Sequence, residues 1–321
     1  MAYHVPVMVE EVVTALATDP SGVYVDATAG GGGHAEALLR ALGERGHLLV
    51  CDRDAAAVNE AGRRLDPYRG RVTFLQCAFS SLGRSVAPLL DRLERSGVEG
   101  VLFDLGVSSH QIDEPGRGFS YHQDGPLDMR MDRGAGEPAD QLLGRIREAD
   151  LVELIRRNGE ERQARRIARS ICRSRDEGRM QTTAQLARAI ESTRPERPTK
   201  TLARVFQALR IAVNDELTEL EKGLRGAVDL LAPGGRLAVI AYHSLEDRIV
   251  KHRMGSLTRG CVCPPDLPVC ACGRRPTFRR IGPARRPGAE EQAANSRSRS
   301  ATLRFFEKIP CTSGGTGGAV R

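Results

Sequence analysis

A glycine-rich turn follows the first apolar run of the sequence. The run GVYVDATAG (22–30) ends in turn residues, and the glycines continue to Gly33, where a segment with helical spacing begins. Glycine lets a backbone approach a ligand closely, and the first turn of a helix offers free N–H groups. The pattern predicts a binding site for an adenosyl or nucleotide cofactor, with a tight structural turn as the alternative.

Acidic residues stand near the ends of two later apolar runs. Asp52 lies in HLLVCDR, roughly twenty residues beyond the glycines, where a carboxylate can accept hydrogen bonds from ribose hydroxyls. Asp104 lies in FDLGVSS, and ligands of open α/β sheets bind at the carboxyl ends of the strands. We therefore expect Asp104 to face both cofactor and substrate. As a purely structural residue it would cap the turn that follows.

The glycines and Asp52 suit a nicotinamide cofactor and S-adenosylmethionine equally. The segment LLAPGGRLAVI (230–240) combines a helix end, a Pro-Gly-Gly turn and a late strand. It resembles the corresponding segment of class I S-adenosylmethionine-dependent methyltransferases. This segment therefore favours S-adenosylmethionine.

The elements that must position these residues alternate along the first hundred residues. Strand-like runs at 22–30, 47–53, 71–77 and 100–106 are separated by segments with helical spacing. Near-continuous apolar runs are typical of parallel strands that are covered on both faces. The alternation predicts a doubly wound α/β sheet.

The alternation stops after this region. Residues 139–211 carry a helical and basic pattern without a strand-like run, which predicts an inserted helical domain for substrate recognition. One long helix is expected at about 200–232, and strands resume at 235–244 and 302–309. We therefore expect a discontinuous cofactor-binding domain (1–138 and 212–309) with a basic loop (255–300), followed by a disordered tail (310–321).

The positive charge of the chain is concentrated in two blocks. The 321 residues carry a net charge of +7. Residues 156–210 hold fifteen basic and six acidic residues, and residues 273–304 hold nine arginines and two glutamates. The rest of the chain is net acidic. Such blocks favour a polyanionic partner, most simply nucleic acid, over a merely solvated helix face and loop.

Four of the eight cysteines crowd into CVCPPDLPVCAC (261–272). Four thiolates at close spacing suit tetrahedral zinc, although the usual spacing in zinc sites is Cys-x-x-Cys. Two disulfides are not expected in a cytoplasmic protein. We hypothesise a structural zinc ion with four ligands: Cys261, Cys263, Cys270 and Cys272.

Nine sequence blocks together resemble one protein family. They are HVPVMVEEVV, DATAGGGGHA, CDRDAAAV, FDLGVSS, RGFSYHQDGPLDMRMD, GEERQARRIARSI, RVFQALRIAVNDEL, PGGRL and YHSLEDRIVK, in this order. The chain resembles the ribosomal RNA small-subunit methyltransferase H family, also called MraW, over about residues 4–308. The resemblance implies a class I S-adenosylmethionine-dependent methyltransferase fold. It also implies methylation of the exocyclic N4 amine of one cytidine in 16S rRNA.

The resemblance further implies where the cofactor binds. The implied contacts are Gly32, Gly33 and His34 in the glycine loop, Asp52 at the ribose, Phe79 beside the adenine, and Asp104 and Gln111 near the methionine end. Without the resemblance, His34 and Phe79 would be interpreted as an ordinary helix-start residue and an ordinary core aromatic. This chain departs from its relatives in NSRSRS, where they more often have Asn-Pro-Arg-Ala-Arg-Ser, and in Tyr242, where Phe is commoner.

The chemistry of an aromatic amine makes demands on the site. Its lone pair is delocalised into the ring, so an acceptor for the N–H groups favours attack and removes the proton. Asp104, with the carbonyls of the Leu105–Gly106 turn, is the candidate. DNA amine methyltransferases carry (Asp/Ser)-Pro-Pro-(Tyr/Phe) here, whereas this chain has Asp-Leu-Gly-Val, so another group must hold the base. Tyr242 and His243 are candidates, with a turn that packs the sheet end as the structural alternative.

Three other functions fit part of the sequence. A nicotinamide oxidoreductase would explain Asp52, but neither the basic insertion nor PGGRL. A non-enzymatic RNA-binding assembly factor would leave Asp104 unexplained. A methyltransferase that acts on cytosine in DNA, or in another RNA, would keep the chemistry and change the polymer.

Composition also limits where the protein works. No apolar run approaches the ~20 residues that a membrane span needs. The first residues lack a basic start followed by an apolar stretch. We therefore expect a cytoplasmic protein that acts on the small ribosomal subunit, without a membrane partner. A homodimer is left open.

Overall fold

The computed structural model describes residues 6–260, 263–264, 267–269 and 271–310. The chain divides into two compact units, which we call unit 1 and unit 2. Unit 1 is Met1–His4, Arg53–Ala56 and Gly106–Glu219, and unit 2 is Val5–Asp52, Ala57–Leu105 and Leu220–Arg321. The predicted insertion (139–211) thus lies within unit 1, which also takes in residues 106–138. Residues 311–321 of the predicted tail lie outside the described residues.

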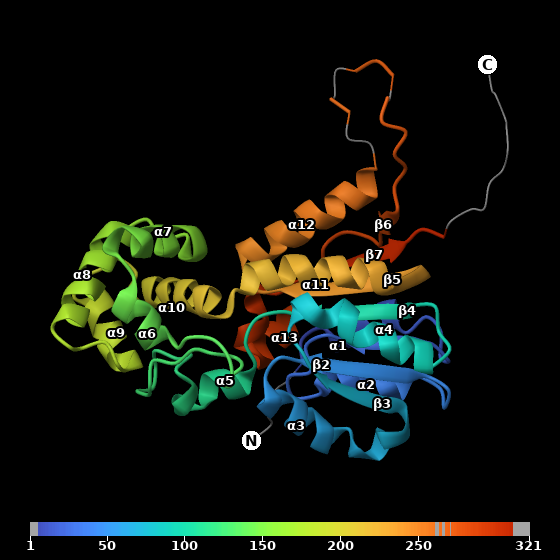
Figure 1. Cartoon of the computed structure of the whole chain (residues 1–321), viewed down its shortest axis with the longest axis horizontal. Coiled ribbons are helices and arrows are strands. Elements are labelled where there is room, and N and C mark those ends of the chain that lie inside the picture. The colour runs from blue at the N-terminus through green and yellow to red at the C-terminus, as the bar shows by residue number, and fades with distance from the viewer. Residues whose placement is uncertain (1–5, 261–262, 265–266, 270, 311–321) are drawn as a thin grey trace. The chain divides into compact units, whose positions relative to one another are not determined.

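Unit 2 contains a seven-stranded sheet (Figure 1). Its strands are β1 (Val23–Asp26), β2 (His47–Asp52), β3 (Val72–Gln76), β4 (Val98–Asp104), β5 (Leu231–Ala241), β6 (Phe278–Arg280) and β7 (Thr302–Lys308). The strand order is β3-β2-β1-β4-β5-β7-β6. Strands β1 to β5 pair in parallel, and β7 is antiparallel to both β5 and β6. The predicted doubly wound sheet is confirmed, with its change of direction between β1 and β4.

Helices cover both faces of this sheet (Figure 1), and each face has its own hydrophobic core. The first face packs against α4 (Leu82–Arg92), α11 (Glu216–Leu230) and α12 (Ser244–Arg259). The second packs against α1 (Val9–Leu16), α2 (Gly33–Ala41) and α3 (Ala55–Arg64). Successive residues of a strand point to opposite faces, so Val23 joins one core and Tyr24 the other. This double burial explains the near-continuous apolar runs of the sequence.

Short elements complete unit 2. They are η1 (Asp66–Arg71), η2 (Phe79–Ser81), α13 (Ala289–Ala294) and η4 (Ser296–Ser300). The sequence did not predict α1, β6 or most of α12. These elements are short, or lack a strong apolar period, and pair with distant parts of the chain.

Unit 1 is helical and has a separate hydrophobic core. Its elements are α5 (Ser109–Asp113), η3 (Pro115–Arg117), α6 (Ala139–Arg145), α7 (Glu148–Gly159), α8 (Ala164–Asp176), α9 (Thr183–Glu191) and α10 (Pro198–Asn214). No strand forms within residues 139–211, all of which the structure describes. The sequence pattern of this segment is therefore confirmed as helical.

The predicted long helix at about 200–232 is wrong, because the chain breaks at Asp215 between α10 and α11. Asp215 adopts a left-handed conformation with φ of +49°. The side chain of the preceding Asn214 donates to the carbonyl of Met129 at 2.7 Å and accepts from the N–H of Met131 at 2.8 Å. These tertiary hydrogen bonds stabilise the break between the two helices. The helical periodicity of the sequence carries no sign of them.

No helix in the described part of the chain is both long enough and apolar enough to cross a bilayer.

Candidate active site

Three strands of unit 2 end in carboxylates. β1 ends at Asp26, β2 at Asp52 and β4 at Asp104. β1 pairs in parallel with both β2 and β4, so the three carboxyl ends share one edge of the sheet. This edge lies at the change of direction in the strand order, where open α/β sheets bind their ligands.

The glycine loop after β1 is held against β2. Gly30 and Gly32 have φ of +47° and +75°, in the left-handed region that favours glycine. The N–H of Gly30 donates to Asp52 Oδ2 at 3.1 Å. A Cβ atom at Gly33 would lie 2.7 Å from Pro6 Cγ, so this position has no room for a side chain. The glycines therefore allow both the left-handed turn and its close packing against Pro6. The N–H of Gly30 links the loop to Asp52.

Asp104 is held from several sides. Its Oδ1 accepts a hydrogen bond from the Tyr242 hydroxyl at 2.8 Å, and its Oδ2 lies 3.4 Å from His34 Nε2. Its backbone N–H donates to Thr28 Oγ1 at 2.8 Å. Burial and the charge of Asp104 raise the pKa of Tyr242 far above its ordinary value, so the phenol stays a donor. The arrangement fixes a carboxylate at the strand end.

A second carboxyl group, Asp26, lies in this cluster and is fully buried. Its Oδ1 accepts from the Thr28 N–H at 3.0 Å. Within the described residues, Asp26 Oδ2 and His34 Nδ1 have no hydrogen-bond partner. Burial raises the pKa of Asp26 to about 7. Burial lowers the pKa of His34, but its close contact with Asp104 and the negative charges of Asp104 and Asp26 outweigh this and raise it.

We expect Asp26→Asn to stabilise the protein increasingly as pH rises. The pKa of this carboxyl is about 7 in the folded state, against 3.8 for an exposed carboxyl in the unfolded chain. Between these two pH values the folded protein therefore binds more protons than the unfolded chain. Its contribution to stability therefore falls as pH rises towards 7, whereas asparagine does not titrate. Between pH 5 and pH 8 the difference in unfolding free energy should grow by about 2–3 kcal/mol in favour of the variant. Denaturant unfolding at both pH values measures it. A difference independent of pH would contradict the prediction.

Phe79 lies in η2, directly after β3. Its ring is half-buried and meets Phe103 edge to face, with 5.2 Å between ring centroids. A Cβ atom at Gly223 of α11 would lie 2.7 Å from Phe79 Cβ. The ring is thus held by the first core, and this firm packing would suit an adenine contact.

Gln111 lies in unit 1, and both polar atoms of its side chain have partners. Its Oε1 accepts from the Ser108 N–H at 3.0 Å, and Ser108 Oγ accepts from the Gln111 N–H at 3.2 Å, which forms the capping box of α5. Gln111 Nε2 donates to Asp54 Oδ2 at 2.8 Å. Arg117 forms a buried ion pair with the same Asp54 oxygen at 2.8 Å. The residue is therefore held in place by unit 1 itself.

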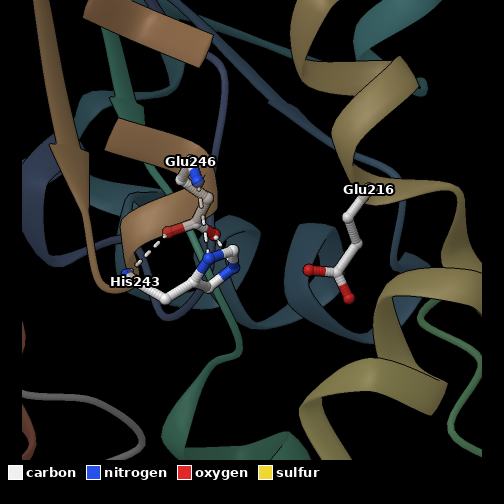
Figure 2. Close-up of side chains that lie close together, drawn as sticks. All are labelled: Glu216, His243 and Glu246. Atoms are coloured by element: carbon white, nitrogen blue, oxygen red, sulfur yellow. Dashed lines mark hydrogen bonds and ion pairs between the residues drawn. The ribbon is translucent and has the colours of Figure 1, made fainter. Parts of the chain in front are cut away.

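His243 is the N-cap residue of α12 (Figure 2). Its Nδ1 accepts from the Glu246 N–H at 3.4 Å, and its Nε2 lies 3.1 Å from Glu246 Oε1. Glu246 Oε2 in turn accepts from the N–H groups of Tyr242 and His243. This reciprocal cap fixes the turn after β5 and so the place of Tyr242.

Sequence reasoning missed two members of the cluster, Asp26 and Thr28. Both stand in VDATAG, within the run that carries the glycines. An acid at the end of a first buried strand could have been noticed as readily as Asp52. Thr28 had no signal, because the role of its hydroxyl depends on its contacts with the backbone of β4 and with Asp26.

A model of the MraW methylase family matches residues 1–309. The chain belongs to the MraW methylase family. It is 49% identical over 313 residues to the ribosomal RNA small subunit methyltransferase H of Symbiobacterium thermophilum, which covers 96% of this chain and 97% of the relative. It is 46% identical over 314 residues to the protein of the same name from Geobacter sp. strain M21, with 96% and 99% covered.

The predicted family and fold class are both confirmed: the MraW chain has the α/β methyltransferase fold with a helical region. A methylase of this fold uses S-adenosylmethionine, which has ribose hydroxyls and a positively charged methionine end. Carboxylates at the ends of β1, β2 and β4 suit such a molecule. The buried, unpartnered Oδ2 of Asp26 is a further acceptor, as judged from the described residues. The acceptor groups of unit 2 thus fit this cofactor.

Proposed function

We propose that this MraW protein methylates the exocyclic N4 amine of a cytidine in 16S rRNA of the small ribosomal subunit. The observation that carries the proposal is the Asp104 carboxylate, held by Tyr242 and His34 at the switch point of the sheet. The names of its relatives and the two basic blocks of the sequence support an rRNA substrate.

For the cofactor we propose the contacts that the family resemblance implies. Asp52 would hold the ribose, the loop Gly32–His34 would line the site, and Phe79 would lie beside the adenine. Asp104 would face the methionine end, and Gln111 would help to close the site. The link from Asp52 to the glycine loop supports a joint role for these two elements.

Bound S-adenosylmethionine supplies a methyl group that its sulfonium has already activated. Transfer to the cytidine N4 leaves that nitrogen with a surplus proton. The Asp104 carboxylate accepts an N–H hydrogen bond from the amine, which localises the lone pair, and then takes this proton. The Tyr242 hydroxyl holds Oδ1 of Asp104, and Oδ2 lies 3.4 Å from His34 Nε2.

Tyr242 and His243 receive distinct roles in this proposal. Tyr242 positions Asp104 through its hydroxyl, and its ring is a surface against which the base can lie. His243 positions Tyr242 through the cap that it forms with Glu246. The two residues therefore act at the same strand end, one directly and one through the other.

We expect Tyr242→Phe to lower kcat by about threefold to tenfold, the effect of one hydrogen bond. The effect is modest because the carboxylate and the aromatic ring both remain. Without the donated hydrogen bond the carboxylate binds protons more readily, so the acidic limb of the pH–rate profile should move to higher pH. Single-turnover methylation across pH measures both changes. A pH profile identical to that of the native protein would contradict the role of the hydroxyl.

The proposed function is tested with small ribosomal subunits that lack the modification. Purified protein and S-adenosylmethionine are added, and the rRNA is digested and analysed by mass spectrometry. We expect new N4-methylcytidine. Methylation of DNA or of another RNA, with none in 16S rRNA, would replace the proposed substrate. Absence of cofactor binding would overturn the interpretation of the glycine loop.

The location, the metal content and the oligomeric state of the protein are further expectations. An rRNA substrate would place the protein in the cytoplasm. The zinc site and the homodimer also stay predictions. Cys261 and Cys270 of the zinc site lie outside the described residues, whereas Cys263 and Cys272 lie within them.

A further inference from the structure

Helix α8 of unit 1 has two faces of opposite character. One face is buried in the core of unit 1 and consists of Ala164, Ile167, Ala168, Ile171 and Cys172. The other is exposed and carries Arg165, Arg166, Arg169 and Arg173. Arg165, Arg169 and Arg173 follow one another at four-residue steps, so they form a row along the helix with a rise of about 6 Å per step.

The guanidinium groups of this face have few acidic partners. Arg169 lies 3.7 Å from Glu148 Oε1. Within the described residues, the guanidinium groups of Arg165, Arg166 and Arg173 make no hydrogen bond or ion pair. Some other exposed arginines of unit 1 have carboxylate partners, such as Arg145 with Glu137 and Arg147 with Asp150. Like charges on one helix face repel each other, so a row without counter-charges favours an external anion.

The four arginines line a hollow of about 390 Å³ that opens to solvent. Its opposite wall is the turn after α9, with Ser192 and Thr193. Ser170 Oγ of α8 lies 2.9 Å from Ser192 Oγ and donates to the carbonyl of Ala189 at 2.7 Å. These hydrogen bonds tie α9 to α8, which lie side by side in unit 1 (Figure 1). The hollow is therefore held in shape by the fold of the unit.

We propose that this hollow binds consecutive phosphate groups of the RNA backbone. The row of arginines supplies the fork-shaped donors that match phosphate oxygens. Backbone contacts of this kind position a nucleic acid without reading its sequence. The inference rests on the proposed rRNA substrate, and it adds the surface of unit 1 that binds the backbone of this RNA.

The test removes the row of charges and compares it with a matched control. The test variant carries Arg165→Gln, Arg169→Gln and Arg173→Gln, and glutamine keeps the helix propensity close to that of arginine. The control variant carries Arg145→Gln, Arg147→Gln and Arg179→Gln, three exposed arginines of unit 1 that have carboxylate partners. Both variants lose three positive charges. Kd for unmodified small subunits is measured over a series of salt concentrations.

We expect the test variant to bind small subunits at least about 30-fold more weakly, with a salt slope smaller by about two to three. The control should stay within about threefold of the native protein. KM for subunits should rise with kcat nearly unchanged, because uniform binding is lost. Affinity for S-adenosylmethionine and the melting temperature should match the native values in both variants.

A test variant whose Kd and salt slope equal those of the control would overturn the proposal. So would a rise in Kd without any change in salt slope, because this would indicate a partner other than a polyanion. If native protein bound the subunits but methylated no rRNA, the proposed reaction would fail. The binding comparison would still decide the role of the hollow.

Discussion

Replacement of Asp104 by asparagine is expected to lower kcat for rRNA methylation by about 10²–10⁴-fold, the usual contribution of a positioned general base. Asparagine has nearly the same shape and keeps an oxygen that can accept from Tyr242, whose hydroxyl lies 2.8 Å from Asp104 Oδ1. It cannot take the proton that the amine must lose. Single-turnover methylation of unmodified small subunits measures the loss.

The affinity for S-adenosylmethionine, measured by calorimetry, separates a chemical defect from a damaged site. We expect it to change far less than kcat, because Asp52 and the glycine loop remain. Asp91→Asn, in an exposed carboxylate on α4 of the same unit, is the matched control and should leave both quantities unchanged. Undiminished kcat in Asp104→Asn would show that another group takes the proton.

Replacement of Arg117 by methionine is expected to destabilise unit 1 by about 3–5 kcal/mol, because it leaves the buried charge of Asp54 without its ionic partner. The Arg117 side chain is 6% exposed, and its Nη1 lies 2.8 Å from Asp54 Oδ2. Its Nη2 donates to the carbonyls of Arg130 and Met131 at 3.1 and 2.9 Å. The Arg117 side chain thus links η3 to the loop that contains Arg130 and Met131, and to the segment after β2. Calorimetric unfolding of the whole chain measures the effect.

Two further variants make this prediction specific. Arg145→Met removes an exposed arginine that is paired with Glu137, and it should leave the unfolding transition where it is. In the double variant that combines Arg117→Met with Asp54→Asn, no buried charge is left without a partner. The loss of unfolding free energy should therefore be much smaller than the sum of the losses in the two single variants. Additive effects would show that Arg117 stabilises unit 1 independently of Asp54, through its packing and its hydrogen bonds to the carbonyls of Arg130 and Met131.

The sequence by itself determined the elements with strong, local signals. The apolar runs of β1, β2 and β4 show their burial directly, because parallel strands covered on both faces carry near-continuous apolar side chains. Asp52 and Asp104 could be found because carboxylates at the ends of such runs have no structural necessity. The blocks shared with the MraW family led to the family itself, which the matches confirm. The basic character of α8 was also plain from composition.

Only the tertiary structure decided which side chains meet. Asp26 and Thr28 gain their importance from β4, whose backbone lies beside theirs although it is distant along the chain. Tyr242 reaches Asp104 only because β5 pairs with β4. The break at Asp215 depends on hydrogen bonds from Asn214 to Met129 and Met131, which no helical period contains. Periodicity reports how each segment is buried, whereas hydrogen bonds between distant segments depend on the register in which the strands and helices finally pack.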